Sequence, residues 1–179
     1  MRPVPLALVL ALTACVSAPP IEADPIPEAA APVFDPLVFF EGELVGEGRL
    51  KVAFSDTVPV RVKSFGRVTD GVLVLEQDIA EGDKPVRSRS WTMRGAAGQG
   101  EGAGRYAGWL SDAGEDKTGG PVEGSVTGNT LRLTFTMDGM PVEQVLTLSR
   151  DGRRAYNVLT VRRLGLPVAV LSEDIRKTD

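Results

Sequence analysis

The heptapeptide LRLTFTM, residues 131–137, decides the fold class of this 179-residue chain. Its apolar and polar residues alternate, so one face carries Leu131, Leu133, Phe135 and Met137 and the other carries Arg132, Thr134 and Thr136. Successive side chains of a β-strand point to opposite faces, so this period of two predicts a half-buried strand. The same alternation occurs in VPVRVK, residues 58–63, and in RSRSWTMR, residues 87–94. The pattern indicates an all-β domain.

Turn signals separate the predicted strands at short intervals. Dipeptides that accept the positive φ of tight hairpin turns are Asp70-Gly71, Gly128-Asn129, Asp138-Gly139 and Asp151-Gly152. Strands are expected near residues 43–54, 58–69, 72–79, 86–94, 104–111, 121–127, 130–137, 141–149, 153–162 and 166–173. Mostly short links, without a helix long enough for a parallel crossover, favour an antiparallel up-and-down meander of about ten strands. Such a sheet tends to close, which predicts a lipocalin-like barrel, with an open β-sandwich as the alternative.

The segment DPLVFFE, residues 35–41, lies just before the first predicted strand. An Asp-Pro pair is a helix start signal. We expect one helical turn here, closing one end of the barrel.

The amino terminus has the layout of a secretory signal. Arg2 precedes an apolar run over residues 3–14, which as a helix would reach only about 18 Å and falls short of the ~30 Å core of a bilayer. The run ends in LTAC, residues 12–15, which resembles the bacterial lipobox. Residues 1–14 are therefore predicted to be a lipoprotein signal peptide and Cys15 the lipidated residue. The alternative is a plain signal peptide cut after Ala18.

The segment after the predicted anchor has the composition of a linker. Residues 16–33, VSAPPIEADPIPEAAAPV, hold five prolines and three acids and no aromatic residue. In polyproline II form this segment would span about 55 Å. Residues 15–33 are thus predicted to be a lipidated cysteine with a Pro-rich linker, followed by a β-barrel domain over residues 34–179.

Charge and residue content exclude several functions. Without residues 1–14 the formal charge changes from −4 to −5 because Arg2 is lost, so a nucleic-acid partner is not expected. The chain has no histidine and one cysteine, which excludes Ser-His-Asp and Cys-His catalysis and the usual zinc ligands. We expect no enzyme, no cofactor and no metal. Asp112, Glu115 and Asp116 lack the spacing of a calcium loop, and the glycine run over residues 95–104 reads as a hairpin loop rather than a phosphate loop.

Three stretches resemble the bacterial lipoprotein family catalogued as domain of unknown function 3833. They are FDPLVFFEGELVGEGRL at residues 34–50, GRYAGWLSD at 104–112 with GSVTGNTLRLTF at 124–135, and NVLTVRRLGLPVAVL at 157–171. The resemblance implies an envelope lipoprotein with a lipocalin-like fold. It implies no established activity, but members of the family often sit beside fatty-acid-modifying enzymes, which favours a lipid ligand.

The candidate ligand-binding residues are Trp91, Met93, Arg89 and Tyr106. Trp91 and Met93 share one strand face with Arg89, so an acyl tail could pack on the apolar pair while its head group stays near the cation. The alternative is that these aromatic residues are plain core. Three glycines, Gly46, Gly48 and Gly108, are expected to vacate volume inside the barrel. The pairs Arg153-Arg154 and Arg162-Arg163 meet either phospholipid head groups or only solvent.

The sequence therefore predicts a lipid-anchored lipoprotein of the cell envelope, on the outer membrane and facing the periplasm. Val16 follows the cysteine instead of the aspartate that commonly signals retention in the inner membrane, which is the basis for outer-membrane delivery by resemblance. Its barrel is expected to bind or carry a small fatty-acyl or lipid ligand. The alternative function is a structural or interaction module that docks on an envelope protein without a small ligand.

Overall fold

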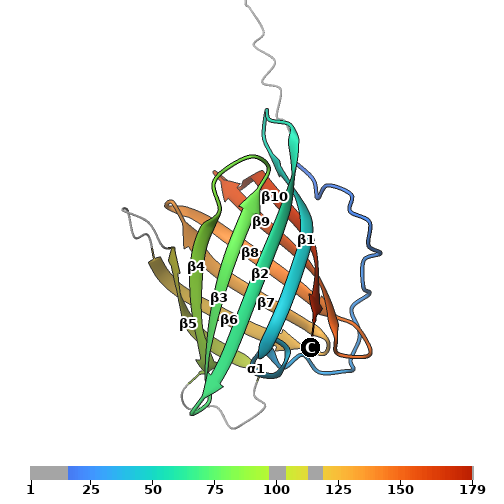
Figure 1. Cartoon of the computed structure of the whole chain (residues 1–179), viewed down its shortest axis with the longest axis vertical. Helices are drawn as coiled ribbons and strands as arrows, with labels where there is room; N and C mark the ends of the chain where they lie inside the picture. The colour runs from blue at the N-terminus through green and yellow to red at the C-terminus, as the bar shows by residue number, and fades with distance from the viewer. Residues whose placement is uncertain (1–15, 97–103, 113–118, 179) are drawn as a thin grey trace, which may run out of the picture.

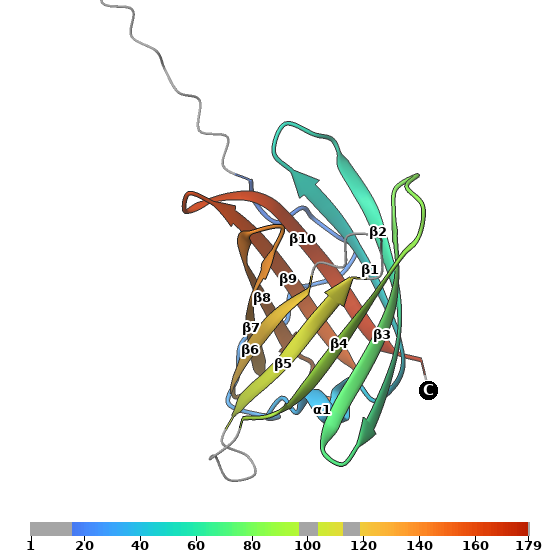
Figure 2. The same ribbon diagram turned by 90° about the vertical axis from the view of Figure 1, so that its left-hand side faces the viewer.

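The chain folds into one closed antiparallel β-barrel (Figures 1 and 2). A computed structural model describes residues 16–96, 104–112 and 119–178. The ten strands are β1 (Gly42–Val52), β2 (Thr57–Thr69), β3 (Val72–Glu81), β4 (Arg87–Gly95), β5 (Arg105–Asp112), β6 (Gly119–Thr127), β7 (Thr130–Met137), β8 (Met140–Leu148), β9 (Arg154–Arg163) and β10 (Leu166–Lys177). Each pairs with its neighbour in sequence, and β1 pairs with β10 from Leu44↔Lys177 to Val52↔Ala169. The predicted barrel is confirmed, and the open sandwich is wrong.

The predicted turns join these strands. Asp70-Gly71 has φ values of 51° and 71°, and Asp138-Gly139 has 50° and 72°. These left-handed conformations suit aspartate and glycine better than bulky residues. The strand bounds lie within two residues of prediction except in β10, which continues four residues further, to Lys177.

The two ends of the barrel differ. At the closed end, α1 (Pro36–Phe39) is the single helical turn predicted there, and Asp35 caps it by accepting from the backbone N–H of Leu37 at 2.9 Å. Phe39 lies edge-on to Phe34 and Phe40, with ring centroids 5.3 and 5.0 Å apart. At the open end lie the β1–β2, β3–β4, β7–β8 and β9–β10 turns (Figure 2). The closed end is thus plugged by aromatic side chains.

Alternation along the strands divides inward from outward residues. Leu131, Leu133 and Phe135 are at most 7% exposed, while Arg132 and Thr134 between them are exposed. The strand register carries this alternation around the barrel, since directly paired residues share a face. Apolar side chains from β1 and β3–β10 therefore meet α1 in one core. That main core includes Phe34, Phe39, Leu44, Leu73, Leu75, Trp91, Met93, Leu110, Leu146 and Ile175.

Residues 16–33, called here the docked segment, run down the outside of the barrel from the open to the closed end (Figure 1). The segment has no helix or strand, as a Pro-rich composition predicts. It is not a free linker, however. Val16 and Pro19 are buried, and the Ser172 hydroxyl on the outer face of β10 donates to the Pro19 carbonyl. The prediction of a poorly packing 55 Å spacer is therefore corrected.

Asn129 fixes the lower part of the docked segment. Its Oδ1 accepts from the Ala29 N–H at 2.7 Å, and its Nδ2 donates to the carbonyls of Pro27 at 3.1 Å and Leu148 at 2.9 Å. The Asn129 N–H donates to the Ala29 carbonyl at 2.9 Å. One buried amide thus satisfies backbone groups of the segment and of β8. Ala29 and Pro27 are about a hundred residues from Asn129 in sequence, so local composition gave no sign of these contacts.

Candidate functional site

Polar side chains interrupt the apolar interior about halfway along the barrel. Gln77, Gln144 and Glu173 face inward from β3, β8 and β10 and border a cavity of about 40 Å³. The rest of its lining is largely apolar and comprises Phe40, Leu73, Leu75, Trp91, Met93, Leu133 and Ile175. A cavity of this size holds on the order of one to three waters. Ligand sites usually measure about 300–1,000 Å³, so the space beside Trp91 does not accommodate an acyl chain.

Glu173 is an acid inside the barrel wall. It is 5% exposed, and its Oε2 accepts from Asn157 Nδ2 at 2.9 Å. Burial raises the pKa of Glu173 to about 7, because a charged carboxylate loses its hydration. The Asn157 hydrogen bond opposes this rise, and the neighbouring Asp174 charge adds to it. The acid therefore changes protonation near neutral pH.

Two acceptor atoms near Glu173 have no hydrogen-bond donor among the described residues. They are Oε1 of Gln144 and Oδ1 of Asn157. Buried polar atoms are nearly always paired. The cavity offers room for water beside Gln144, and a protonated Glu173 is itself a donor. We call Gln77, Gln144, Asn157 and Glu173 the polar layer. The layer is rich in hydrogen-bond acceptors, so it is suited to bind a hydrogen-bond donor rather than an anionic head group.

Trp91 contacts this layer. Its Nε1 donates to Gln77 Oε1 at 2.6 Å, and Gln77 Nε2 is 3.2 Å from Ser64 Oγ. The indole meets Phe135 edge-on, with centroids 5.2 Å apart. Met93 lies two residues further along β4 and is 4% exposed. Both predicted residues face inward, and both are packed.

Arg89 also faces inward, but its charge is already bound. The side chain is 5% exposed, and its Nε donates to Asp112 Oδ1 at 2.6 Å. Arg87 approaches the same carboxylate at 3.7 Å, and Met137 Sδ lies 3.8 Å from Arg89. The predicted role of Arg89 as a free cation for a head group is therefore corrected. Asp112 is the member of the predicted acidic trio that the structure describes.

Tyr106 lies apart from Trp91, toward the closed end. It pairs with Gly95 and Gly124 on either side of β5 and packs against the main core. Burial raises the pKa of its phenol, and the Asp35 carboxylate adds to the effect. The structure thus separates Tyr106 from the other three candidate residues.

The inward glycines do not vacate volume. A Cβ on Gly46 or Gly48 would overlap Glu173 or the Ser172 carbonyl, and one on Gly108 would overlap the Thr92 carbonyl. These glycines instead let neighbouring groups approach the wall closely. The expectation of an empty interior is corrected at these three positions.

The open half of the barrel has a different lining. Val60, Val62 and Ile79 of β2 and β3 form a separate apolar cluster with the half-buried Leu50 and Leu171. The facing side chains of β7–β9 belong to the main core instead, including Phe135, Val142, Leu159 and Val161. Inward residues near this end that stay half-buried are Gly48, Leu50, Met137, Met140, Gln144, Ala169 and Leu171. Inward side chains near the open end are therefore less completely buried than those packed against α1.

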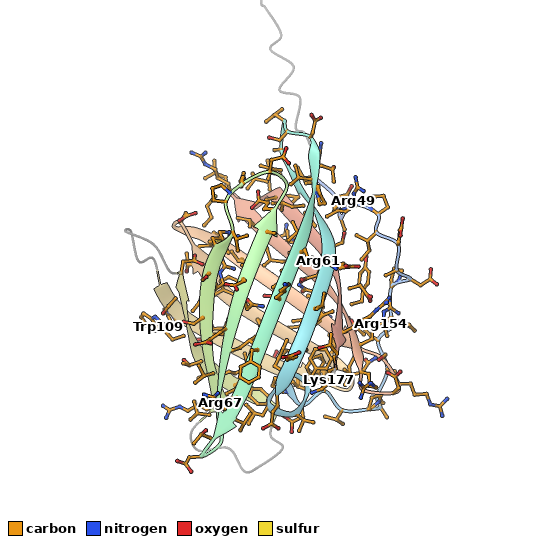
Figure 3. All side chains as sticks on the ribbon, in the orientation of Figure 1. Arg49, Arg61, Arg67, Trp109, Arg154 and Lys177 are labelled. Carbon is orange, nitrogen blue, oxygen red and sulfur yellow. The ribbon has the colours of Figure 1, made fainter. Side chains whose placement is uncertain are left out.

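A groove of about 1260 Å³ runs over the outer face of β1–β5. Trp109 borders it, 50% exposed, and Figure 3 shows its side chain on the outside of the barrel. Phe65, 43% exposed, lies in the same groove with charged residues such as Lys63 and Glu76. Acids such as Glu43 and Asp78 are mixed with the cation Lys63 in its lining, so neither sign of charge prevails among the described residues there. It is an exposed, mixed surface.

The two arginine pairs lie at opposite ends. Arg162 and Arg163 end β9 at the open end. Arg153 and Arg154 lie at the closed end, where Arg154 contacts the Asp174 carboxylate and donates to the Asp24 carbonyl at 2.6 Å (Figure 3). The two pairs therefore do not form one surface.

The fold defines the class as an all-β, ten-stranded lipocalin-like barrel. No model of a known protein family matches the chain, and no curated protein matches it. Cys15 lies outside the described residues. Within them, no helix is long and apolar enough to cross a membrane, and no group of three or more metal-binding side chains occurs.

Proposed function

We propose that this chain is a lipoprotein of the bacterial cell envelope, anchored through Cys15, whose barrel binds one fatty-acyl or lipid molecule. The observation that supports the ligand is the apolar lining of the open half of the barrel, where the cluster of Val60, Val62 and Ile79 meets the main core through Leu171. Below this lining lie Gln77, Gln144 and Glu173, called here the polar floor. An apolar pocket with few polar groups is the usual form of a small-molecule site. We propose a ligand position closer to the open end than the sequence suggested, because the cavity of about 40 Å³ that borders Trp91 is too small for an acyl chain.

The amino-terminal pattern supports the anchor. Arg2, the short apolar run and LTAC ending at Cys15 fit a lipoprotein signal, and outer-membrane delivery facing the periplasm follows from Val16 by resemblance. Several acyl chains on one residue would hold the protein firmly, since each buried methylene contributes about 0.8 kcal/mol. The family resemblance stays a prediction.

The binding test uses the purified mature chain and oleate that displaces a fluorescent fatty acid. Ile79→Trp fills the open half from its β3 wall and should weaken oleate binding at least about tenfold. Val74→Trp is the matched control, because Val74 is on the same strand but faces outward and is 42% exposed. Circular dichroism checks that both variants fold. Equal binding by both variants, or no binding by the unsubstituted chain at tens of micromolar, contradicts the proposal.

A second readout follows the two tryptophans. Trp91 lies at the floor and Trp109 on the outside of the barrel. A ligand tail that reaches the floor changes the emission of Trp91, so Trp91→Phe should lose the oleate-induced change and Trp109→Phe should keep it. Native mass spectrometry with lipid extraction then identifies what the barrel carries.

The second candidate is an interaction module that docks on an envelope protein. The outer groove favours it, because Trp109 and Phe65 are exposed there beside charged residues. Trp109→Ala should weaken capture of such a partner while leaving oleate binding unchanged. The opposite outcome would favour the barrel interior.

A further inference from the structure

Apolar side chains gather on the turns of the open end. Five of the exposed large apolar residues lie there, and we call them the apolar rim: Val52, Phe54, Val86, Leu164 and Leu166. Leu164 is 97% exposed and Phe54 is 90% exposed. They come from three separate turns, β1–β2, β3–β4 and β9–β10, which both views place at the end opposite α1 (Figures 1 and 2). Single exposed apolar residues are ordinary, but several at one end indicate a contact surface.

The backbone makes the rim unusual. Leu164 has φ 50° and is followed by Gly165 with φ 81°, the same pattern as Asp70-Gly71 and Asp138-Gly139. Phe54 has φ 62°. Bulky residues are disfavoured in this left-handed region, where aspartate, asparagine and glycine are enriched. Leu164 thus serves neither the turn nor the solubility of the chain in water.

The docked segment brings the amino terminus to the same end. Its first residue, Val16, is 8% exposed. Three residues later, the Pro19 carbonyl accepts a hydrogen bond from the Ser172 hydroxyl, which holds this part of the segment on β10. The segment begins beside the open end in both views (Figures 1 and 2). Cys15 is joined to Val16 by one peptide bond, which spans about 3.8 Å between Cα atoms. Acyl chains on Cys15 would therefore start from the end that carries the rim.

Cations flank the rim. Arg162 and Arg163 precede Leu164, and Arg162 Nη1 reaches the Gly165 carbonyl at 3.5 Å. Lys51 precedes Val52 and its Nζ donates to the Ser55 carbonyl at 2.5 Å. Long cationic side chains beside inserted apolar residues are suited to lipid phosphates.

We propose that the apolar rim inserts into the lipid bilayer that holds the anchor, so that the open end of the barrel faces the acyl region of that bilayer. This inference rests on the proposed anchor at Cys15. It also names the source of the ligand, because a lipid could pass between membrane and barrel without crossing water.

The test adds one tryptophan at a time to the full lipidated chain, which keeps Trp91 and Trp109. Each variant is reconstituted in vesicles of phosphatidylethanolamine and phosphatidylglycerol with brominated acyl chains. Phe54→Trp and Leu164→Trp report on the rim, and Val74→Trp reports on the outer wall away from it. The unsubstituted chain gives the background of Trp91 and Trp109. Bromine should quench the rim tryptophans roughly threefold more than residue 74, as expected for groups buried ~5–10 Å into the interface.

Mass spectrometry of the same sample shows whether Cys15 is acylated. If Cys15 is acylated and the rim tryptophans are quenched no more than the tryptophan at residue 74, the proposal that the rim inserts is wrong and the anchor proposal stands. If Cys15 carries no acyl groups and the rim tryptophans are still quenched more strongly, the anchor proposal is wrong and insertion of the rim is supported. Equal quenching at all three positions, whatever the state of Cys15, means that the rim does not insert.

Discussion

The carboxylate of Glu173 occupies the space that a side chain at Gly46 would need, because a Cβ built on Gly46 would overlap Glu173 Oε1. The two residues are diagonal neighbours on the β1–β10 pair that closes the barrel, since Gly46 lies opposite Ile175 and Gly48 lies opposite Glu173. A buried acid is thus accommodated at the seam by glycines. The polar layer therefore borders the pair of strands that closes the barrel.

Gly46→Ala should lower the free energy of unfolding by about 1–3 kcal/mol, since overfilling a packed interior displaces its neighbours. Urea denaturation measures the change. Gly120→Ala is the control, because a Cβ at that glycine meets no atom within 4 Å. An unchanged midpoint for Gly46→Ala would mean that Glu173 moves aside freely.

Glu173 should make stability depend on pH between about 4.5 and 7. Its pKa is raised from 4.5 to about 7 in the folded chain, so the folded state holds the proton more tightly than the unfolded state. The stabilisation is complete below the unfolded pKa and is lost as the pH rises through 7. Relative to Glu173→Gln, the unsubstituted chain should lose about 2 kcal/mol between pH 5 and pH 8.

The Glu173 prediction is checked by urea denaturation of both chains at each pH. Asp174 faces outward and pairs with Arg154 and Arg176, so Asp174→Asn tests whether the neighbouring charge is responsible instead. Parallel pH profiles for the unsubstituted chain and Glu173→Gln would contradict the assignment.

Asn129→Ala should release the lower part of the docked segment. The change leaves the Ala29 N–H and the Pro27 and Leu148 carbonyls without their side-chain partner, at a cost of about 2–3 kcal/mol. Limited proteolysis should then cut within residues 16–33 faster than in the unsubstituted chain. Glu28→Gln removes only an exposed ion pair with Arg132, and its effect should stay below about 0.5 kcal/mol. Equal protection in both variants would show that Asn129 is not the main contact.

Leu164→Asn should stabilise the barrel by about 0.5–1 kcal/mol, because asparagine tolerates the left-handed conformation of this turn. The reverse change, Asp70→Leu, places leucine in the same conformation at the closed end and should destabilise by a similar amount. Thermal unfolding compares the two variants. If Leu164→Asn is less stable than the unsubstituted chain, the leucine makes a contact that supports the turn.

The sequence predicted the strands well because both of their signals are local. The alternation in LRLTFTM predicts which of its side chains face inward, and the Asp138-Gly139 pair predicts the turn that it forms. Contacts between residues far apart in the chain were not predicted from the sequence. The pairing of Arg89 with Asp112 depends on register, and the hydrogen bond from Asn129 to Ala29 joins segments about a hundred residues apart.

Glu173 was missed for a different reason. Ser172, Glu173 and Asp174 look like the polar end of a strand, yet Ser172 and Asp174 are buried on the outer face of β10 and Glu173 is buried inside. Three polar residues between apolar neighbours in LSEDI were the available signal. From alternation alone, these three polar residues are expected to be exposed to solvent, because the pattern does not show that the docked segment lies over the outer face of β10.

The pairing of β1 with β10 also constrains biosynthesis. A nascent chain that emerges amino terminus first cannot complete the β1 ladder until Leu166–Lys177, its last strand, has been made. The Pro19 contact likewise waits for Ser172. The docked segment therefore has no final binding surface until nearly the whole chain has been made.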